Sequence, residues 1–412
     1  MNFVSCMENG KVPIKVIIAI FLLSFLLRLL LIILHPNMPL STDAIHDYDP
    51  IATNLLKGNG FVVGIGRPDS IRGPGYPLFL SAIYYMFGRS FIAVRFVQII
   101  IDSITVVLTF ILSWIVFARW DRAFIAGIIL AIYPLSIYSS NLIAVENLFA
   151  FTFILSIIFF IMAVKADKIV LYFISGAFLS FTTMVRSTTL LFLIIMGTWL
   201  FLFVSIRKKY IYYFLFLCFG FIITLAPWTI RNYKVFHEFI PTVANGGNNF
   251  YAGSSIRYLI PLDARIPLKK QEIKGYSQEG IQNKEVSSPN ELDAHYWRMG
   301  WFNYRNTWKD NPLNVLRLLL YKAARFWFAT DSGRYQTLIS FIQIPFLLIA
   351  TIGLVSIIRS HNFSKELWLM VMGVVYFWVI FIIMFPLARY SIPILPFLSI
   401  FISGLWKRRT II

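Results

Sequence analysis

Long apolar runs separated by short polar turns dominate the pattern along the 412-residue chain. A membrane span needs about 20 apolar residues, and the first run of this length covers residues 16–35. Similar runs follow in two groups, one before and one after a long polar stretch. The pattern therefore predicts about ten spanning helices, at 16–35, 91–117, 123–140, 145–164, 169–184, 188–206, 210–227, 336–358, 367–386 and 391–405.

Composition supports this interpretation. Hydrophobic residues make up 58% of the chain and charged residues only 14%, whereas ordinary soluble domains are about 45–50% apolar and about 25% charged. The mean hydropathy is +0.73. We therefore expect an all-α integral membrane protein whose external loops form a roof over an active site.

Two polar regions interrupt the apolar runs, and they suggest three segments. Residues 1–227 would form an N-terminal transmembrane core with the external loop 36–90, residues 228–335 an external polar region, and residues 336–412 the C-terminal transmembrane helices. The polar middle of the second region, 269–293, has the composition of a mobile segment. Segment 312–328 mixes leucines with Arg317, Lys322 and Arg325, which favours an interfacial helix over a span.

The formal net charge of +18 could suggest a nucleic-acid partner, but the distribution of the charge argues against one. Lys and Arg gather in the N-terminal tail, in alternate short loops and in the C-terminal "KRR", while acids balance bases in loop 36–90. Because Lys and Arg in short loops mark the cytoplasmic side, we expect cytoplasmic termini in the cell membrane, an external loop 36–90, and membrane lipids as partners.

The residues that could bind metals or nucleotides give no signal. Cys6 and Cys218 are too few for a disulfide framework or a zinc site. The five histidines lack metal-ligand spacing, and no Gly-rich loop ends in Lys-Ser or Lys-Thr. We expect neither a metal site nor nucleotide hydrolysis.

Three charges fall inside predicted spans, namely Arg28, Arg95 and Asp102. Arg95, Gln98 and Asp102 share one helix face at 3.6 residues per turn, and such a face must meet protein or water. The depth of Arg28 matches that of Asp102, which predicts a structural ion pair between the first two spans; a polar pocket for a donor substrate is the alternative.

The stretch "STDAIHDYDP" places Asp43, Asp47 and Asp49 directly after the first span. Acids near a membrane are costly unless water, a cation or a reacting group needs them. The simplest interpretation is a set of solvated acids, with Asp43 as a helix cap.

Further motifs follow this acidic stretch in order, and together they resemble the membrane-embedded C-type glycosyltransferases. The nearest groups are the protein O-mannosyltransferases and the bacterial transferases that modify lipid A with aminoarabinose. The resemblance covers about 40–255 and 385–400 and is carried by "ATNLLKGNGF", "RGPGYP", "FGRSFIAVRFVQ", "AIYPLSIYSSNLIAVENLF", "APWTIRNYKVF" and "ARYSIPILPFL".

The resemblance implies that the sugar arrives on a polyprenyl phosphate and that an acid in the first external loop is the catalytic base. Asp43 and Asp47 are the candidates. The family acid commonly precedes the tyrosine by three or four positions, whereas Asp43 precedes Tyr48 by five and Asp47 by one. Glu146 would be a second active-site acid; as an alternative, it is a helix-start acid favoured by the helix dipole.

For substrate binding, the resemblance points to Arg72, Tyr48, Arg231, Asn232 and Arg389. Arginines suit a departing lipid phosphate, whose negative charge needs a guanidinium fork. Arg72 could instead meet lipid phosphate, and Arg389 could extend from the membrane edge to water. Beyond these, Arg186 is a possible phosphate ligand, and the glycines of "NGGNNF", 245–250, would let the backbone approach a ligand.

The expected function is inverting transfer of a hexosyl or pentosyl group from a polyprenyl-phosphate sugar to a lipid, glycan or protein acceptor, without a cofactor. The alternative is a transporter or flippase of lipid-linked sugar. Transporters often show paired halves with broken helices, and the chain shows no such pairing.

Overall fold

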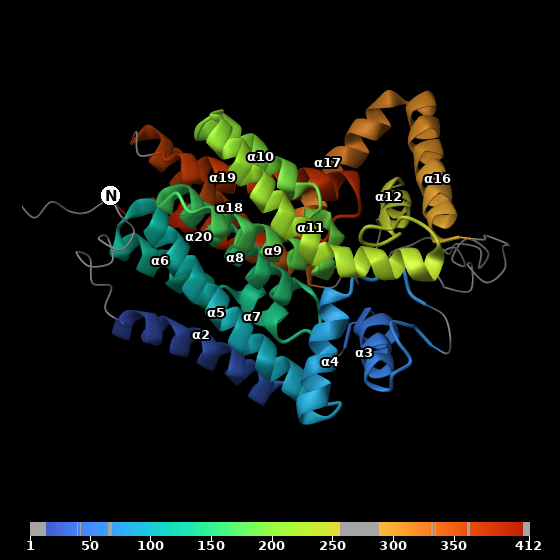
Figure 1. Cartoon of the computed structure of the whole chain (residues 1–412). Coiled ribbons are helices and arrows are strands. Elements are labelled where there is room, and N and C mark those ends of the chain that lie inside the picture. Colours follow the sequence, from blue (N-terminus) through green and yellow to red (C-terminus); the bar gives the residue numbers. More distant parts are fainter. Residues whose placement is uncertain are drawn as a thin grey trace, which may run out of the picture.

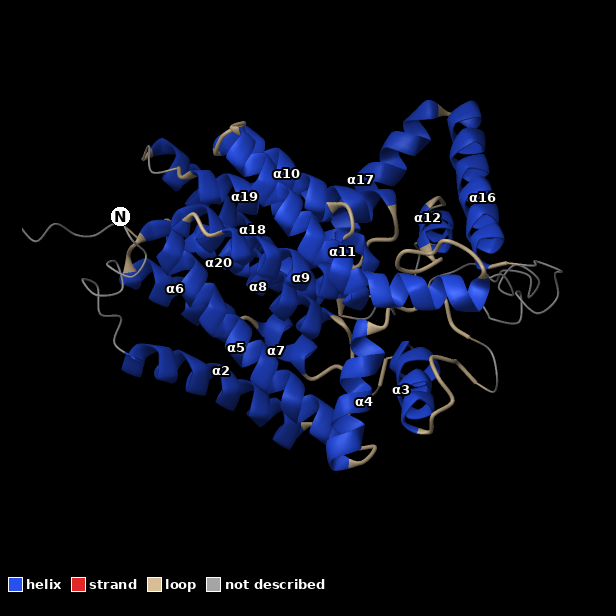
Figure 2. Cartoon of the chain, in the orientation of Figure 1, coloured by secondary structure: helices blue, strands red, loops and turns tan. Residues whose placement is uncertain are grey.

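The computed structural model describes residues 14–38, 40–41, 43–64, 68–255, 288–330, 333, 335–360 and 363–406. These residues form helices joined by loops (Figure 2), with one isolated antiparallel bridge between Val62 and Pro68. The predicted all-α class is confirmed. Both chain ends, Cys6 and residues 256–287 lie outside the described residues, so the structure does not test the tail charges or the mobility expected for 269–287. The end of that expected mobile segment, 289–293, instead forms the start of helix α16 (Pro289–Asp310).

Six of the described helices are long and apolar enough to span a membrane, which makes the chain a multi-pass membrane protein. A bent pair could count as a seventh span, and three shorter apolar helices accompany them, so a count of about ten spans is not confirmed. The six are α2 (Ile14–Leu34), α5 (Phe91–Phe117), α8 (Glu146–Ala166), α11 (Lys208–Phe236), α18 (Gln336–Arg359) and α19 (Lys365–Ile383). The bent pair is α6 (Trp120–Ile132) and α7 (Pro134–Ser140); the shorter helices are α9 (Ile169–Val185), η2 (Ser187–Thr189) with α10 (Phe192–Phe203), and η4 (Ala388–Ile394) with α20 (Leu395–Ser403).

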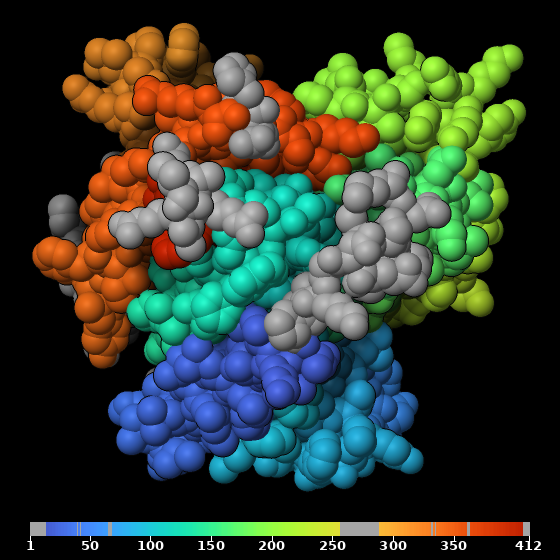
Figure 3. Space-filling model, turned by 90° about the vertical axis from the view of Figure 1, so that its left-hand side faces the viewer, coloured from blue at the N-terminus to red at the C-terminus, as the bar shows by residue number. Residues whose placement is uncertain are grey.

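Helix α8 is the most buried of the six long helices and packs against α5, α9 and η4. Helices from distant parts of the chain meet around it: α20 contacts α6, and α11 contacts α9. Figure 3 looks onto the end near the N-terminus, where blue, turquoise, green and orange segments adjoin. The N-terminal and C-terminal groups of helices therefore build one bundle.

Close packing of α9 against α11 depends on two glycines. A β-carbon at Gly176 would lie 2.0 Å from the carbonyl oxygen of Leu217, and one at Gly220 would lie 2.2 Å from that of Phe173. Small residues at such positions let helix backbones approach within a membrane.

The predicted span 123–140 is broken at Tyr133, where α6 and α7 meet at 58°. Tyr133 has extended backbone angles, φ −70° and ψ 118°. The cause is Pro134, because a proline disfavours the helical conformation of the residue before it. The bend turns α7 across the bundle, next to α2 and α5.

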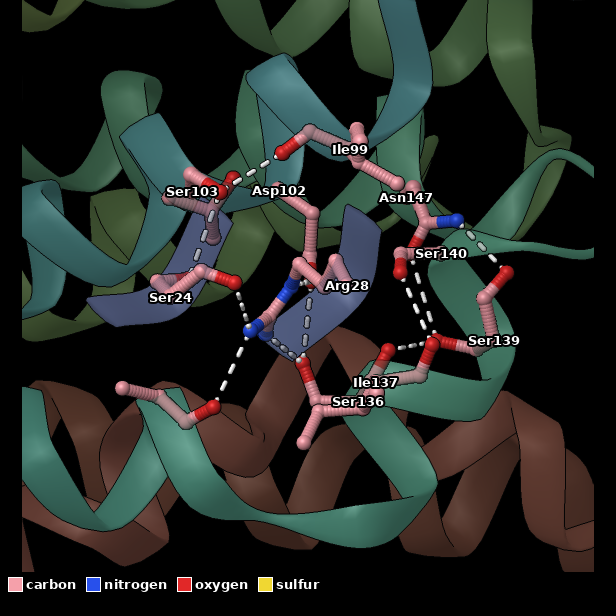
Figure 4. A network of polar contacts seen from close by, with 12 residues as sticks. Ser24, Arg28, Ile99, Asp102, Ser103, Ser136, Ile137, Ser139, Ser140 and Asn147 are labelled. Carbon is pink, nitrogen blue, oxygen red and sulfur yellow. Dashed lines mark hydrogen bonds and ion pairs between the residues drawn. The ribbon is translucent and has the colours of Figure 1, made fainter. Parts of the chain in front are cut away.

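Arg28 of α2 and Asp102 of α5 form the ion pair predicted from their depth (Figure 4), with 2.5 Å between Arg28 Nε and Asp102 Oδ2. Both side chains are buried. The remaining guanidinium nitrogens donate to the carbonyl oxygen of Ala131 (3.0 Å) and to Ser136 Oγ (2.9 Å). The pair thus joins the first two spans to the bent pair, which is a structural role.

The elements of the two polar regions, 36–90 and 228–335, gather at the other end of the bundle, to the right in Figure 1. They are the turn η1 (Ala44–Tyr48), α3 (Asp49–Leu56), α4 (Gly75–Phe87), α12 (Gly246–Gly253) and α16 (Pro289–Asp310).

Helix α11 continues through the segment boundary that the sequence suggested at residue 227. Helix α17 (Pro312–Phe328) has the bounds predicted for the interfacial helix and packs on α19 and η4.

We predict that Asp102→Asn destabilises the protein, because it leaves the buried charge of Arg28 without its partner. Breaking a buried pair in this way costs about 3–5 kcal/mol. The measurement is the melting temperature of purified protein in detergent. Asp121→Asn is the matched control: its partly exposed pair with Arg119 should contribute less than about 1 kcal/mol. An unchanged melting temperature for Asp102→Asn would contradict the assigned role.

Candidate active site

The acidic stretch after α2 is tied to the bundle by Arg95 of α5. Its guanidinium donates to the carbonyl oxygens of Pro36 (2.6 Å) and Met38 (2.5 Å). The chain then enters η1, a π-helical turn, and continues directly into α3 with Pro50 in its first turn. Proline fits there because the first helical N–H groups have no partner within the helix. Asp43 is thereby held at the start of a fixed turn.

Of the three acids in this stretch, Asp49 has partners that the other two do not contact. Asp49 accepts hydrogen bonds from Tyr84 Oη (2.9 Å) and from Arg89 Nε and Nη2 (3.0 and 2.7 Å), so it joins α3 to α4. The side chain of Asp43 caps no helix, which makes the capping interpretation wrong.

Asp43 and Asp47 share Arg72, which lies in the loop before α4. Arg72 Nη2 is 2.5 Å from Asp47 Oδ2 and 3.3 Å from Asp43 Oδ1. The second oxygen of Asp43 is 3.0 Å from Arg389 Nη2, in η4. Both oxygens of Asp43 are therefore occupied by arginines that are distant in sequence.

Glu146, the first residue of α8, extends this arrangement. Its Oε1 atom is 3.6 Å from Arg389 Nε and 3.3 Å from Arg186 Nη1, at the end of α9. Arg186 also lies over the ring of Tyr390, 3.8 Å from its centroid, a favourable cation–π geometry. We call this alternating series the charge chain; its members in order are Asp47, Arg72, Asp43, Arg389, Glu146 and Arg186.

The charge chain borders a cavity of about 740 Å³. This volume lies within the range of small-molecule sites. Asp43 lines the cavity, whereas Asp47 lies behind Arg72 and does not. The walls combine the charges with an amide-rich side and an apolar side, formed by Tyr48, Arg72, Glu146, Arg186, Arg389, Tyr390, Thr242, Asn245, Asn248, Asn249, Leu190, Leu191, Tyr376, Ile380, Phe381, Met384 and other residues.

The environments of Asp43 and Asp47 differ in their effect on proton affinity. Burial acts to raise the pKa of Asp43, but Arg389 and Arg72 together hold this pKa below its usual value. Burial raises the pKa of Asp47, and Arg72 offsets this effect only in part. Asp43 is accordingly the more firmly ionised carboxylate and the one that faces the cavity.

Arg231 and Asn232 lie outside the cavity. Arg231 donates to the carbonyl oxygens of Phe61 and Asp69, both at 3.0 Å. The buried Asn232 donates to the carbonyl oxygen of Ile240 at 3.0 Å. Both residues organise the backbone of the external loops, and neither is placed for the substrate contact expected from the sequence.

Helix α12 forms the amide-rich wall and packs against α16. A β-carbon at Gly247 would lie 2.1 Å from the carbonyl oxygen of Asp293, so this glycine serves helix packing. Its N–H donates to Asp293 Oδ1 at 2.8 Å. Of the two glycines expected to admit a ligand, Gly247 therefore does not, whereas Gly246 lines the cavity together with Asn245, Asn248 and Asn249.

Lys322 of α17 fixes the far side of the same wall. Its fully buried ammonium donates to the carbonyl oxygens of Gly253 (2.9 Å) and Ile383 (3.0 Å) and lies 3.1 Å from Tyr304 Oη. Burial lowers the pKa of Lys322 to about 7. A single lysine thus connects α12, α16 and α19, although the sequence suggested only an interfacial charge.

Among the described residues, no group of three His, Cys, Asp or Glu side chains could hold a metal ion. The facing oxygens of Asp43 and Asp47 contact arginines instead. The site is therefore organised by guanidinium groups.

Comparison with known proteins agrees with this geometry. Residues 71–228 match the model of the family described as dolichyl-phosphate-mannose-protein mannosyltransferase. The resemblance to C-type glycosyltransferases is confirmed. The matched range, less than half of the chain, contains Arg72, Glu146 and Arg186 of the charge chain. No curated protein sequence matches the chain.

Solved structures of an oligosaccharyltransferase from Archaeoglobus fulgidus share the fold. The complex with an inhibitory peptide and a dolichol-phosphate has a TM-score of 0.58 at 13% identity and covers 96% of this chain. The complex with Zn and sulfate has a TM-score of 0.58 at 13% identity and covers 94% of this chain. The enzyme tethered to an acceptor peptide has a TM-score of 0.51 at 13% identity and also covers 94% of this chain. The chain matches 50%, 48% and 49% of these proteins, so it spans about half their length.

We predict that the wall tied by Lys322 weakens as the pH falls. The folded protein holds this pKa near 7 against an ordinary 10.5, so the unfolded chain binds more protons between these values and stability rises with pH there. The melting temperature should therefore rise from about pH 7 to about pH 10, and less steeply in Lys322→Met. Lys309→Met, at an exposed position of α16, is the control. Equal slopes for wild type and Lys322→Met would rule out this role.

Proposed function

We propose that the protein transfers a sugar from a polyprenyl-phosphate donor to a hydroxyl-bearing acceptor, in a cavity at the outer face of the membrane. One observation carries the proposal: Asp43, Glu146 and three arginines from distant parts of the chain converge on a single cavity at one end of a membrane bundle. The family match over 71–228 and the shared fold support the same class of reaction.

The proposed step is an inverting displacement at the anomeric carbon. The acceptor oxygen forms a bond to that carbon and gives its proton to Asp43, while the bond to the phosphate oxygen breaks. The electron pair leaves with the polyprenyl phosphate. Arg389 and Arg72 stabilise the charge that grows on this phosphate, because guanidinium groups bind its oxygens in a fork.

Asp43 is the better candidate for the base. It borders the cavity, whereas Asp47 does not line the cavity and is paired with Arg72. A base must reach the proton that it accepts, and geometry takes precedence over pKa in choosing it. Asp47 then serves to hold Arg72 in position.

The apolar wall of the cavity suits the lipid chain of the donor, and the amide-rich wall suits the acceptor. Leu191, Tyr376 and Ile380 lie on the apolar side, and half of Leu191 is exposed on the surface of the bundle, which suits an isoprenoid chain entering from lipid. Asn248 and Asn249 lie on α12 and Asn245 directly precedes it, and amides suit the hydroxyls of an acceptor. The proposed orientation keeps the positive loops cytoplasmic and this end outside.

We predict that Asp43→Asn lowers the transfer rate by about 10²–10⁴-fold, the usual contribution of a general base. Asp47→Asn should lower it less than Asp43→Asn does, because Asp47 does not line the cavity and acts only through its ion pair with Arg72. The measurement is radiolabelled sugar transferred from a panel of polyprenyl-phosphate sugars to endogenous acceptors in proteoliposomes. Full activity in both variants would overturn the mechanism, and movement of the sugar lipid across the bilayer without a new glycosidic bond would indicate a transporter.

We further predict different effects for two arginines. Arg389→Gln should raise the KM for donor about 10–100-fold, because it removes a hydrogen bond to a charged group. Arg231→Gln should leave this KM unchanged and lower the melting temperature, because it frees the loop carbonyls of Phe61 and Asp69. Donor KM and melting temperature of both variants test this. A raised donor KM in Arg231→Gln alone would place the phosphate elsewhere.

A further inference from the structure

We infer that the donor phosphate itself activates Asp43: in the empty site two arginines restrain its carboxylate, and a bound phosphate draws them away. The donor would then bind before the acceptor reacts. This inference rests on the proposed function and adds an order of events to it.

The restraint follows from the contacts of Asp43. One of its oxygens meets Arg72 Nη2 at 3.3 Å and the other meets Arg389 Nη2 at 3.0 Å. Hydrogen bonds and positive charge that favour the ionised form make a carboxylate a weaker proton acceptor. In this arrangement Asp43 is well placed to take a proton but has little tendency to do so.

Both arginines keep a second acidic partner when they release Asp43 and turn toward a phosphate. Arg72 retains Asp47 at 2.5 Å, and Arg389 retains Glu146 at 3.6 Å. Nε of Arg72 is buried, with no hydrogen-bond partner among the described residues. Each of these two guanidinium groups is shared between two acids, so a phosphate that carries several charged oxygens can compete with Asp43 for it.

The charge balance of the site favours the same sequence of events. Three arginines act on Asp43: Arg72 from the loop before α4, Arg389 from η4 and Arg186 from the end of α9. Glu146 of α8 shares Arg389 with Asp43. The turn that follows Asp43 adds Asp47, Tyr48 and, acting on Asp47, His46. The charge chain itself holds three acids and three arginines. A phosphate adds negative charge to this balanced set, so the site gains affinity for a proton, and the acceptor hydroxyl supplies that proton during attack.

The cycle closes without a further reactant. After transfer, Asp43 holds the proton from the acceptor and the arginines hold the polyprenyl phosphate. When that lipid leaves, the arginines return to Asp43 and the proton passes to water. Each turnover therefore resets the base.

The test measures protonation of Asp43 directly, by infrared difference spectra of the carboxylic-acid carbonyl band during a pH titration of the full chain in nanodiscs. The band is assigned by its loss in Asp43→Asn or, if that variant fails to fold, by its displacement in Asp43→Glu. Farnesyl phosphate is the probe, and farnesol, which has the same chain without phosphate, is its matched control.

With farnesyl phosphate we expect the proton affinity of Asp43 to rise at least tenfold, which corresponds to one pKa unit, and with farnesol we expect no change. Arg389→Gln should raise the affinity without any ligand. Arg231→Gln removes a charge outside the cavity and should have no effect.

An unchanged titration of Asp43 with farnesyl phosphate bound would overturn the inference, and so would failure of the probe to bind. Neither result depends on sugar transfer. If the titration of Asp43 responds as expected but no polyprenyl-phosphate sugar of the panel serves as donor, the proposed function fails, while the effect of phosphate on Asp43 stands. If transfer occurs without the response, the inference alone fails.

Discussion

Carboxylates at the end of an apolar bundle need opposite charge close by, and the charge chain meets this need by alternation. Arg72 serves Asp43 and Asp47, while Arg389 serves Asp43 and Glu146. Because these arginines are shared, the position of each acid depends on the others. Removing one member would leave a partly buried charge unbalanced, which is far more costly than losing an exposed pair. The cavity is therefore shaped by electrostatics as much as by packing.

The ends of the helices in the bundle place these side chains at the cavity. Glu146 is the first residue of α8, and Arg186 follows the last residue of α9. Arg389 lies in η4, which packs directly on α8. Deeper in the bundle, the pair Arg28–Asp102 joins the helices that carry the acidic stretch and its anchor Arg95. Polar contacts at two depths of the bundle thus fix the position of the site relative to the spanning helices.

Several features could be predicted from the sequence because they depend on position along one helix. The pair Arg28–Asp102 followed from depth, and α17 followed from a segment that mixes leucines with arginines and a lysine. The direction in which a side chain points around its helix could not be predicted in this way. Arg231 stands at the expected level, but α11 continues to Phe236 and turns this arginine toward loop carbonyls. Lys322 gave no distinctive signal, because its partners are two backbone oxygens and the Tyr304 hydroxyl, all on other elements.

The number of spans was harder to predict for a related reason. Hydropathy detects apolar runs, yet α9, α10 and α20 are short, and Pro134 divides another run. The sequence did carry a signal for Arg186. This residue directly follows the apolar helix α9, at the same end of the bundle where Glu146 begins the preceding helix, α8. Depth alone, however, does not distinguish a cavity residue from one that faces lipid.

The π-helical turn between Asp43 and Tyr48 has a consequence for how such sequences are compared. A π turn closes hydrogen bonds over five residues, so it holds one residue more than an α turn, and such turns occur frequently at functional sites. The wider separation of acid and tyrosine in this chain can thus be absorbed locally, since both side chains still border the same cavity. A search pattern with a fixed acid–tyrosine interval would overlook enzymes built in this way, and an alignment here should permit a one-residue gap.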